Sequence, residues 1–377
     1  MSTPVLDRPA DATTYAAHAH PLWRRALVTP EVAVIALLVL VYAWSNANVA
    51  NFDNPLTLYY LFLDTAPILL IALPMTLVIV TGEIDLSVAS VVGLSSVVVG
   101  MLHHDAGLSI PVAAALAVVM GMAAGALNGF LVAYVGLPSL AVTIGTLALY
   151  RGIAVGLLGT EAVTDFPDKW TDLAKERISE GSSYPMVLVP FVILLVLFAW
   201  LLHFTSFGRG VYDIGLNSEA AHFSGVNVEL TKFWLFVLCG AVSAFAGVYY
   251  TLRYGSARGD NATGLELSVI AAVLLGGVSI FGGRGALHGV VAGVLLIGVI
   301  SSAMRLENYT VNVINIVIGV LLVLSVMTTS LLGRARSLAA RARGGGPRPP
   351  RRRNAVAAAP ASESSTEDSG TQERHPE

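Results

Sequence analysis

The chain has 377 residues, of which 55 % are hydrophobic and only 12 % are charged, and its mean hydropathy is +0.71. Soluble proteins carry about 25 % charged residues. So little charge cannot cover a globule of this size, which excludes a soluble enzyme, a disordered chain and a nucleic-acid-binding protein. The formal net charge is only −3. The composition predicts an all-α, polytopic integral membrane protein.

Ten apolar runs follow one another along the chain, each near the ~20 residues that a helix needs to cross the hydrocarbon core. We place them at residues 31–47, 57–80, 86–103, 110–135, 138–159, 185–204, 232–252, 266–281, 286–304 and 309–332. No small-residue cleavage site follows the first run, so we interpret it as a retained helix rather than a signal peptide. The eighth and ninth runs can also be interpreted as one long run broken at residues 282–285.

The two ends of the chain differ in composition from the apolar region. Residues 1–30 are polar and end in a basic pair, and they predict a cytoplasmic segment that precedes a transmembrane domain at 31–332. Residues 334–353 contain eight arginines, and residues 354–377 consist mainly of Ala, Ser, Glu and Thr. Because this region has too little apolar surface to fold, we expect 333–377 to be a disordered cytoplasmic tail. Its arginines can contact anionic lipid headgroups or remain solvated.

The distribution of Lys and Arg predicts the orientation. Ten spans place both termini on one side of the membrane. The loops and ends on that side carry fifteen Lys and Arg residues, against six on the other side, with Arg151 left in the membrane. Cationic loops remain in the cytoplasm, so we expect both termini to be cytoplasmic. The only cysteine is Cys239, so a disulfide framework is excluded.

A weak internal repeat links the two halves of the chain. The sequence Asp-Leu-Ser-Val at 85–88 recurs as Glu-Leu-Ser-Val at 266–269, and each opens an apolar run, the third and the eighth. The next run in each half carries a glycine ladder, namely Gly121, Gly125 and Gly129 in the fourth run and Gly285, Gly289 and Gly293 in the ninth. Ten spans make the matched helices run in opposite directions. This is the pattern of inverted repeats in transporters, whose solute route lies at the repeat interface.

Ionisable side chains inside a membrane are costly and need a reason. Besides Asp64 and Arg151, the candidates are Glu83, Asp85 and Glu266. Residues 81–87 contain glycine and several hydrogen-bonding side chains between two apolar runs, which predicts a broken or re-entrant segment. Asp85 and Glu266 can line a gate, or they can cap the helices that follow them.

Smaller polar side chains extend this candidate site. Ser87 and Ser268 belong to the repeated motifs, and Asn128, Thr143 and Thr146 fall at mid-membrane positions of the fourth and fifth runs. They can hydrogen-bond a polyol in transit, or they can bond between helices.

Residues 205–231 form an inside loop under this topology. Asn217 or Ser218 can cap a short helix there, Glu219 favours its first turn, and Gly225 can end it. A short amphipathic helix in such a loop suits docking to a partner, although it can also be a plain surface helix.

Several chemical motifs are absent from the sequence. There is no G-x-x-x-x-G-K-[ST] phosphate-binding loop, and no nucleophile–base pair stands out. His103, His104 and Asp105 have no further ligand nearby, so we expect no metal. We therefore expect this chain to be neither an enzyme nor a cofactor-binding protein.

Together these motifs resemble the membrane-spanning permease subunits of ATP-binding-cassette (ABC) sugar importers of the ribose type. Five separated blocks carry the resemblance, at residues 72–87, 128–129, 138–152, 208–225 and 266–289. Residues 255–260 look most like the rhamnose and autoinducer-2 branches of that group.

The resemblance implies roles for particular residues. Glu219, Ala220, Ala221 and Gly225 match the loop signature that contacts the ATPase subunit, although residues 226–230 lack the Leu-Pro pair of longer versions. Glu83 stands where the family commonly has glycine. The family also implies two permease subunits, two cassette ATPase domains and a sugar-binding receptor, with ATP hydrolysed by the partner subunit.

The sequence therefore predicts a multi-pass protein of the bacterial inner membrane. It would form the route for a monosaccharide, such as a pentose or a deoxyhexose like rhamnose, and would bind lipid but no nucleic acid. The first alternative is a proton-coupled transporter that uses Asp85 and Glu266 as carriers. A second is a membrane scaffold or intramembrane enzyme, which would move no sugar.

Overall fold

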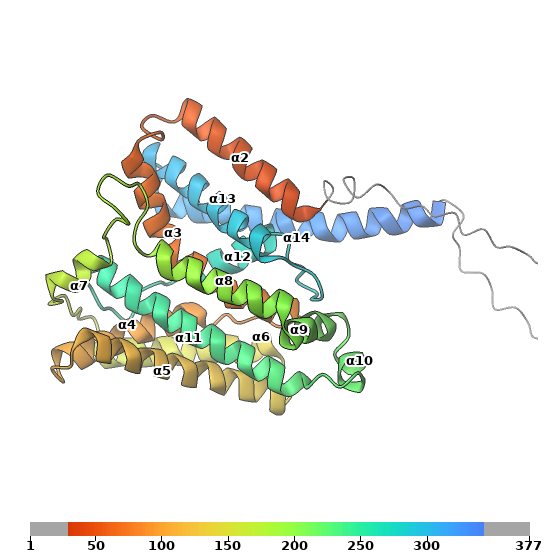
Figure 1. The fold of residues 1–377 in the computed structure, drawn as a ribbon, viewed down its shortest axis with the longest axis horizontal. Coiled ribbons are helices and arrows are strands. Elements are labelled where there is room, and N and C mark those ends of the chain that lie inside the picture. The colour runs from red at the N-terminus through yellow and green to blue at the C-terminus, as the bar shows by residue number, and fades with distance from the viewer. Residues whose placement is uncertain (1–28, 343–377) are drawn as a thin grey trace, which may run out of the picture. The chain divides into compact units, whose positions relative to one another are not determined.

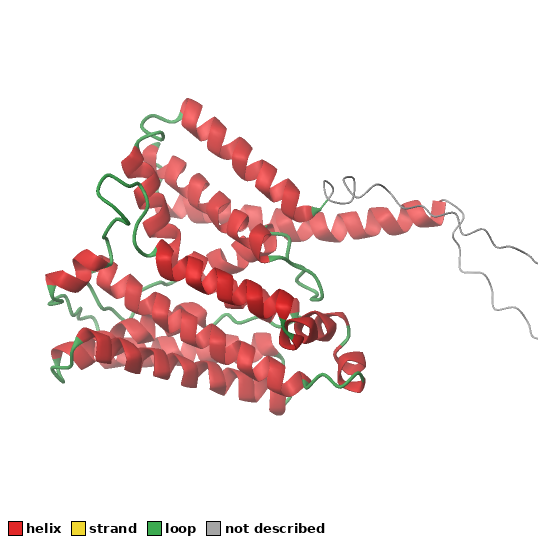
Figure 2. Cartoon of the chain, in the orientation of Figure 1, coloured by secondary structure: helices red, strands yellow, loops and turns green. Residues whose placement is uncertain are grey.

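A computed structural model describes residues 29–342 of the chain, and within them the secondary structure is helical apart from two isolated β-bridges (Figure 2). Most of the predicted cytoplasmic N-terminal segment and most of the predicted tail lie outside the described residues. The chain divides into two units, with the boundary in the sequence between Ser330 and Leu331.

Each of the ten predicted runs contains one apolar helix. In chain order these are α2 (Pro30–Asn48), α3 (Pro55–Val80), α4 (Val88–His104), α5 (Ile110–Gly129), α6 (Ser139–Leu158), α8 (Leu188–Phe204), α11 (Val228–Tyr254), α12 (Leu265–Leu275), α13 (Leu287–Leu306) and α14 (Val311–Ala342). α5 continues directly into a π-helix, η1 (Phe130–Tyr134). The connections contain three short helices, namely α7 (Asp168–Leu173), α9 (Ser206–Leu216) and α10 (Ser218–Phe223).

The helices differ in whether they can cross a membrane. Within the described residues, six are long and apolar enough by length and composition, namely α2, α3, α5 with η1, α6, α11 and α13, and the pair α8–α9, bent by 71°, would make a seventh. α4, α12 and the Val311–Ser325 part of α14 are apolar but shorter. With 11 residues, α12 is about 16 Å long, roughly half of the ~30 Å hydrocarbon core. The eighth of the ten predicted runs, residues 266–281, therefore contains an apolar helix that is shorter than the run.

The structure also defines the boundaries of the last three predicted runs. Residues 276–286 separate α12 from α13, so the alternative of one long broken run reduces to two distinct helices. α14 continues past the predicted boundary at residue 332 as far as Ala342.

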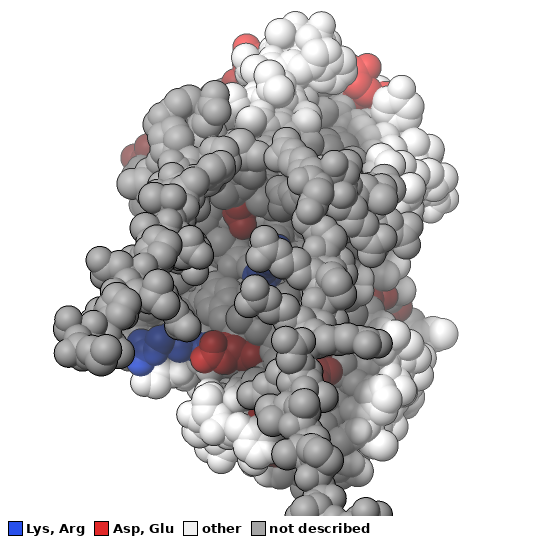
Figure 3. Space-filling view, turned by 90° about the vertical axis from the view of Figure 1, so that its right-hand side faces the viewer, with Lys and Arg blue, Asp and Glu red and all other residues white. Residues whose placement is uncertain are grey.

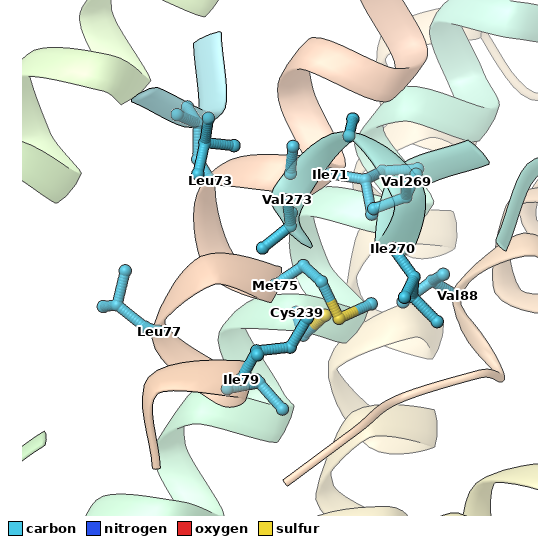
Figure 4. Close-up of a cluster of buried hydrophobic side chains, with 14 of the residues drawn as sticks. Ile71, Leu73, Met75, Leu77, Ile79, Val88, Cys239, Val269, Ile270 and Val273 are labelled. Atoms are coloured by element: carbon cyan, nitrogen blue, oxygen red, sulfur yellow. The ribbon is translucent and has the colours of Figure 1, made fainter. Parts of the chain in front are cut away.

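The long helices lie side by side, with α7 at one end of the bundle and α9 and α10 at the opposite end (Figure 1). α3 lies at the centre of the bundle, since 89 % of its most apolar 18-residue window is buried. α3 continues through Pro67 and Pro74 without interruption. Its Met75 lies next to Cys239 of α11, between side chains of α12 and Val88 of α4 (Figure 4). The core is therefore the place where both halves of the chain meet.

The helix pairs partly follow the predicted inverted repeat. α11 packs against α4 and α5, and the matching helix of the first half, α3, packs against α12 and α13. α3 and α11 also pack against each other. The match is incomplete. In the repeat, α8 corresponds to α2 and α5 corresponds to α13, but α2 packs on α13 whereas α8 packs on α3 and not on α5.

The glycine ladder of α5 brings that helix against the backbone of α11. A Cβ at Gly121 would meet the carbonyl of Gly240, and a Cβ at Gly125 would meet the backbone of Phe236. Such small residues allow close helix contacts in lipid. In the second half, Gly289 and Gly293 face the backbone of α12 and its end at Gly276. Gly285, predicted as part of that ladder, precedes α13 and is not helical.

We predict that Gly125→Ala lowers the stability of the protein by about 1–3 kcal/mol, because the added methyl group must push two backbones apart. The midpoint of thermal unfolding in detergent micelles measures the change. Gly145→Ala on α6 is the matched control, because nothing lies within 4 Å of its Cβ position. An unchanged midpoint for Gly125→Ala would show that α5 and α11 do not make this close contact.

Candidate functional site

Residues 81–87, between α3 and α4, form an irregular segment within the helical core. The backbone amide of Ile84 donates to Ser139 Oγ at 3.2 Å, and its carbonyl accepts from Thr143 Oγ1 at 3.2 Å. Both hydroxyls belong to α6. Irregular backbone at membrane depth is tolerated only where it is buried in protein or lines a wet cavity. The side chains of α6 therefore make this break in the helix possible.

A buried polar network follows directly. Asp85 accepts hydrogen bonds from the amide of Ser87 at 2.9 Å and from its hydroxyl at 2.6 Å. Asn128 of α5 donates to the same Ser87 hydroxyl at 2.8 Å. All three residues are at most 1 % exposed. The Oδ1 atom of Asn128 has no hydrogen-bond partner among the described residues, which leaves one acceptor free inside the network.

Residues 81–87 run along α11 into the bundle. Glu83 forms a half-buried ion pair with Lys232, with Nζ and Oε1 at 2.5 Å. Asp85 lies beside Cys239, seven residues further along α11. Seven helical residues rise about 10 Å. Residues 81–87 therefore enter from the end of the bundle that carries α9 and α10.

A second irregular segment, residues 255–264 between α11 and α12, enters from the opposite end. Ala257 forms a β-bridge with Val163 of the long loop between α6 and α8, and the side chain of Asn261 bonds to Ser96 of α4. Arg151 of α6 donates to the carbonyls of Gly259 and Asn261, both at 2.7 Å, and to that of Ala89 at 3.0 Å. This arginine thus fixes the second segment to α4.

The two acidic residues of the repeat belong to different networks. Glu266 lies in the first turn of α12, where its charge interacts with that of Arg151. Ser268 lines a separate cavity on the other side of α3. Asp85, by contrast, is enclosed by Ser87 and Cys239. The repeat motifs open matching helices without sharing one polar site.

The structure therefore brings together part of the predicted set. Asp85, Ser87 and Asn128 are connected, and Thr143 holds the same segment. Thr146 bonds only to carbonyls of its own helix. Sequence reasoning missed Ser139 and Lys232. Both have a weak sequence signal that could have singled them out. Ser139 follows a proline at the start of an apolar run, and Lys232 is one of only three lysines in the chain.

The loop after α8 folds into two short helices. The Asn217 side chain caps α10 by accepting from the amide of Ala220 at 2.9 Å, and Glu219 lies in the first turn, as predicted. Glu219 and Ala220 are exposed, whereas Ala221 is 3 % exposed and packs on Ile214 and Val228. One side of α10 therefore packs against neighbouring residues, and the other side is exposed. The end of the molecule that carries these helices is seen face-on in Figure 3, where acidic and basic side chains lie next to each other on part of the surface.

α9 and α10, which we call the elbow (residues 206–223), contact the end of α3, just before the first irregular segment, and the loop between α12 and α13. Gly215 lies against the carbonyl of Val80, at the end of α3, and against the backbone of Gly283. The amide of Gly283 donates to that same carbonyl at 2.8 Å. Tyr212 donates to the carbonyl of Gly285 at 2.8 Å. The elbow is therefore in direct contact with the end of α3 and with the loop before α13.

The two halves, their broken helices and the buried polar segments define the class of protein as a polytopic helical membrane transporter. Residues 57–326 match the family described as the branched-chain amino acid transport system / permease component, and the chain belongs to that family. This confirms the resemblance to permease subunits of ABC importers. The chain is such a subunit, a multi-pass membrane protein.

The curated relatives cover nearly the same length. The chain is 34 % identical over 310 residues to the autoinducer 2 import system permease protein LsrD of Yersinia enterocolitica, which is 80 % of this chain and 92 % of that protein. The protein of the same name from Yersinia pseudotuberculosis is 33 % identical over 305 residues, 79 % of this chain and 90 % of its own. No solved structure matches the chain.

We predict that Thr143→Val lowers stability by about 1 kcal/mol, because it removes the donor to the Ile84 carbonyl and leaves that buried group unpaired. Hydrogen exchange of the amides in residues 83–87 should become faster. Thr146→Val is a matched control on the same helix, because its hydroxyl bonds only within α6. Equal effects of the two variants on both measurements would contradict the role of α6 in holding this segment.

Proposed function

We propose that this chain forms the translocation pathway of an importer for a small polyhydroxylated solute, driven by a separate ATPase subunit. The observation that carries the proposal is the elbow. It presents Glu219 and Ala220 to solvent, while Gly215 lies against the end of α3 and Tyr212 bonds to the loop before α13. An elbow of this kind can transmit work from a partner into the bundle. Since the sequence contains no phosphate-binding loop, ATP would be hydrolysed by that partner and this chain would need no cofactor.

Two classes of solute compete. The relatives named above are autoinducer 2 permeases, and the resemblance to ribose-type permeases favours a monosaccharide such as a pentose or rhamnose. Both are small and rich in hydroxyl groups, and buried Ser, Thr and Asn side chains suit them better than charges do. Uptake of autoinducer 2, L-rhamnose and D-ribose into liposomes that contain the complete complex distinguishes the classes.

Two contacts connect the elbow and the following helix, α11, to the first irregular segment, residues 81–87. Gly215 touches the end of α3, and Lys232, four residues into α11, pairs with Glu83. We place Glu83, Asp85, Ser87, Asn128, Thr143 and Thr146 near one half of the route and Glu266 and Ser268 near the other. The complete importer would contain a second permease subunit, identical or related, together with the ATPase and a solute-binding receptor.

We predict that Glu219→Lys abolishes ATP-coupled uptake by the reconstituted complex, because it reverses the charge on the exposed face of α10. Glu229→Lys, at the start of α11, is the control for an equal change of charge outside that helix. Normal uptake by the Glu219 variant would contradict the docking role. Uptake by the chain alone, abolished by an uncoupler, would instead indicate a proton-coupled transporter.

We predict that a cysteine at Ser224, just after α10, reacts only with thiol reagents that reach the cytoplasm, because both termini and the elbow lie inside. A cysteine at Thr164, in the long loop between α6 and α8, should react with membrane-impermeant reagents from outside. The native Cys239 is buried, so it serves as the unreactive background. The reverse pattern of labelling would invert the topology.

A further inference from the structure

A cluster of charges lies at the end of the bundle opposite the elbow. Asp64 of α3 accepts a hydrogen bond from Arg253, at the end of α11, and pairs with Arg305, at the end of α13, at 2.9 Å. Arg253 also donates to the carbonyl of Leu63 at 2.7 Å, and its side chain is only 8 % exposed. The Arg305 side chain is 46 % exposed. Asp64 thus has one fixed partner and one that can move into solvent.

This cluster separates two cavities. The first, of about 330 Å³, opens beside the loop between α2 and α3, where Asn54, Thr57 and Tyr60 line it. The second, of about 180 Å³, lies further along α3 and α13 and is also lined by α12 and α14; we call it the inner pocket. Asp64 and Arg305 line both cavities. Their ion pair therefore stands between an outer vestibule and an inner pocket.

The inner pocket has a lining of mixed chemistry. Half-buried Ser268 and Ser301 and exposed Asn315 contribute hydroxyl and amide groups, and none of these three side chains has a hydrogen-bond partner among the described residues. Ile68, Ile297 and Ile318 contribute apolar surface. The volume corresponds to about six water molecules at ~30 Å³ each, which is small for a drug-sized ligand but suits one small ring. Unpaired hydroxyl and amide groups beside apolar side chains match the hydroxyl groups and the carbon faces of a sugar.

We propose that the inner pocket is a solute-binding site for a small polyol, with Ser268, Ser301 and Asn315 as hydrogen-bonding groups. The Arg305–Asp64 pair closes the pocket on the vestibule side. Loss of Arg305 opens it without exposing an unpaired carboxylate, because Arg253 remains on Asp64. This inference rests on the proposed function, since it assigns that transport route a site in this chain.

The first test compares Asn315→Ala and Ser301→Ala with the control Asn312→Ala, which is one turn away on α14 and lies outside the pocket. In liposomes with the complete complex, the two pocket variants should raise the receptor-bound solute concentration needed for half-maximal uptake by about fivefold each, as expected for the loss of one hydrogen bond. Uptake by both pocket variants equal to that of Asn312→Ala overturns the proposal.

The second test needs no transport. Ser301→Cys in the permease, embedded in lipid vesicles, is treated with a membrane-impermeant thiol reagent in the presence and absence of excess L-rhamnose, D-ribose or autoinducer 2. One of these solutes should slow the labelling by about fivefold or more, and adding Arg305→Gln should accelerate the labelling in the absence of solute. Arg258→Gln, which breaks an exposed ion pair elsewhere, should have no effect.

The two tests separate the possible failures. No ATP-dependent uptake by the native complex contradicts the proposed function, whereas protection of Ser301→Cys by solute would still support the pocket. Uptake by the native complex without protection, and without an effect of Arg305→Gln, overturns the pocket and leaves the proposed function intact.

Discussion

Two stretches of irregular backbone, residues 81–87 and 255–264, enter a bundle of apolar helices, and their buried polar groups need partners away from water. That requirement governs the rest of the structure. α6 meets it for both stretches. Ser139 and Thr143 bond to the backbone of Ile84, and Arg151, three turns from Ser139, bonds to the carbonyls of Gly259 and Asn261. α6 is thus the common support of the two halves, although it belongs to only one of them.

Packing follows from the same arrangement. Because each irregular stretch lies along a neighbouring helix, the helices around it must come close to one another, and glycine supplies the room. Gly121 and Gly125 bring α5 to the backbone of α11, and Gly276 brings the end of α12 to α13. The short α12 packs against α3 and α13. The inner pocket with its three unpaired polar side chains lies there.

The ion pairs mark the two ends of the bundle. Glu83 and Lys232 join the first irregular stretch to the helix that follows the elbow, and Asp64 joins the far ends of α11 and α13. A half-buried pair adds little net stability, since the loss of hydration offsets much of the attraction. Such pairs hold elements in register, and they can be broken and reformed when helices move. α11 takes part in both, so it connects the elbow to the vestibule.

The sequence by itself determined the membrane class, the ten apolar helices, the short capped helix at Ser218–Phe223 and the break at residues 81–87, because these depend on local composition, on spacing and on glycine and capping residues. It also singled out Asp85, Ser87 and Asn128, since polar groups are rare within apolar runs. Only the tertiary structure decided that α12 is half-length, that Thr143 holds the segment while Thr146 does not, and that Lys232 pairs with Glu83, 149 residues away. Those facts depend on which face of each helix meets which neighbour, and such long-range contacts leave no mark in the local pattern of residues.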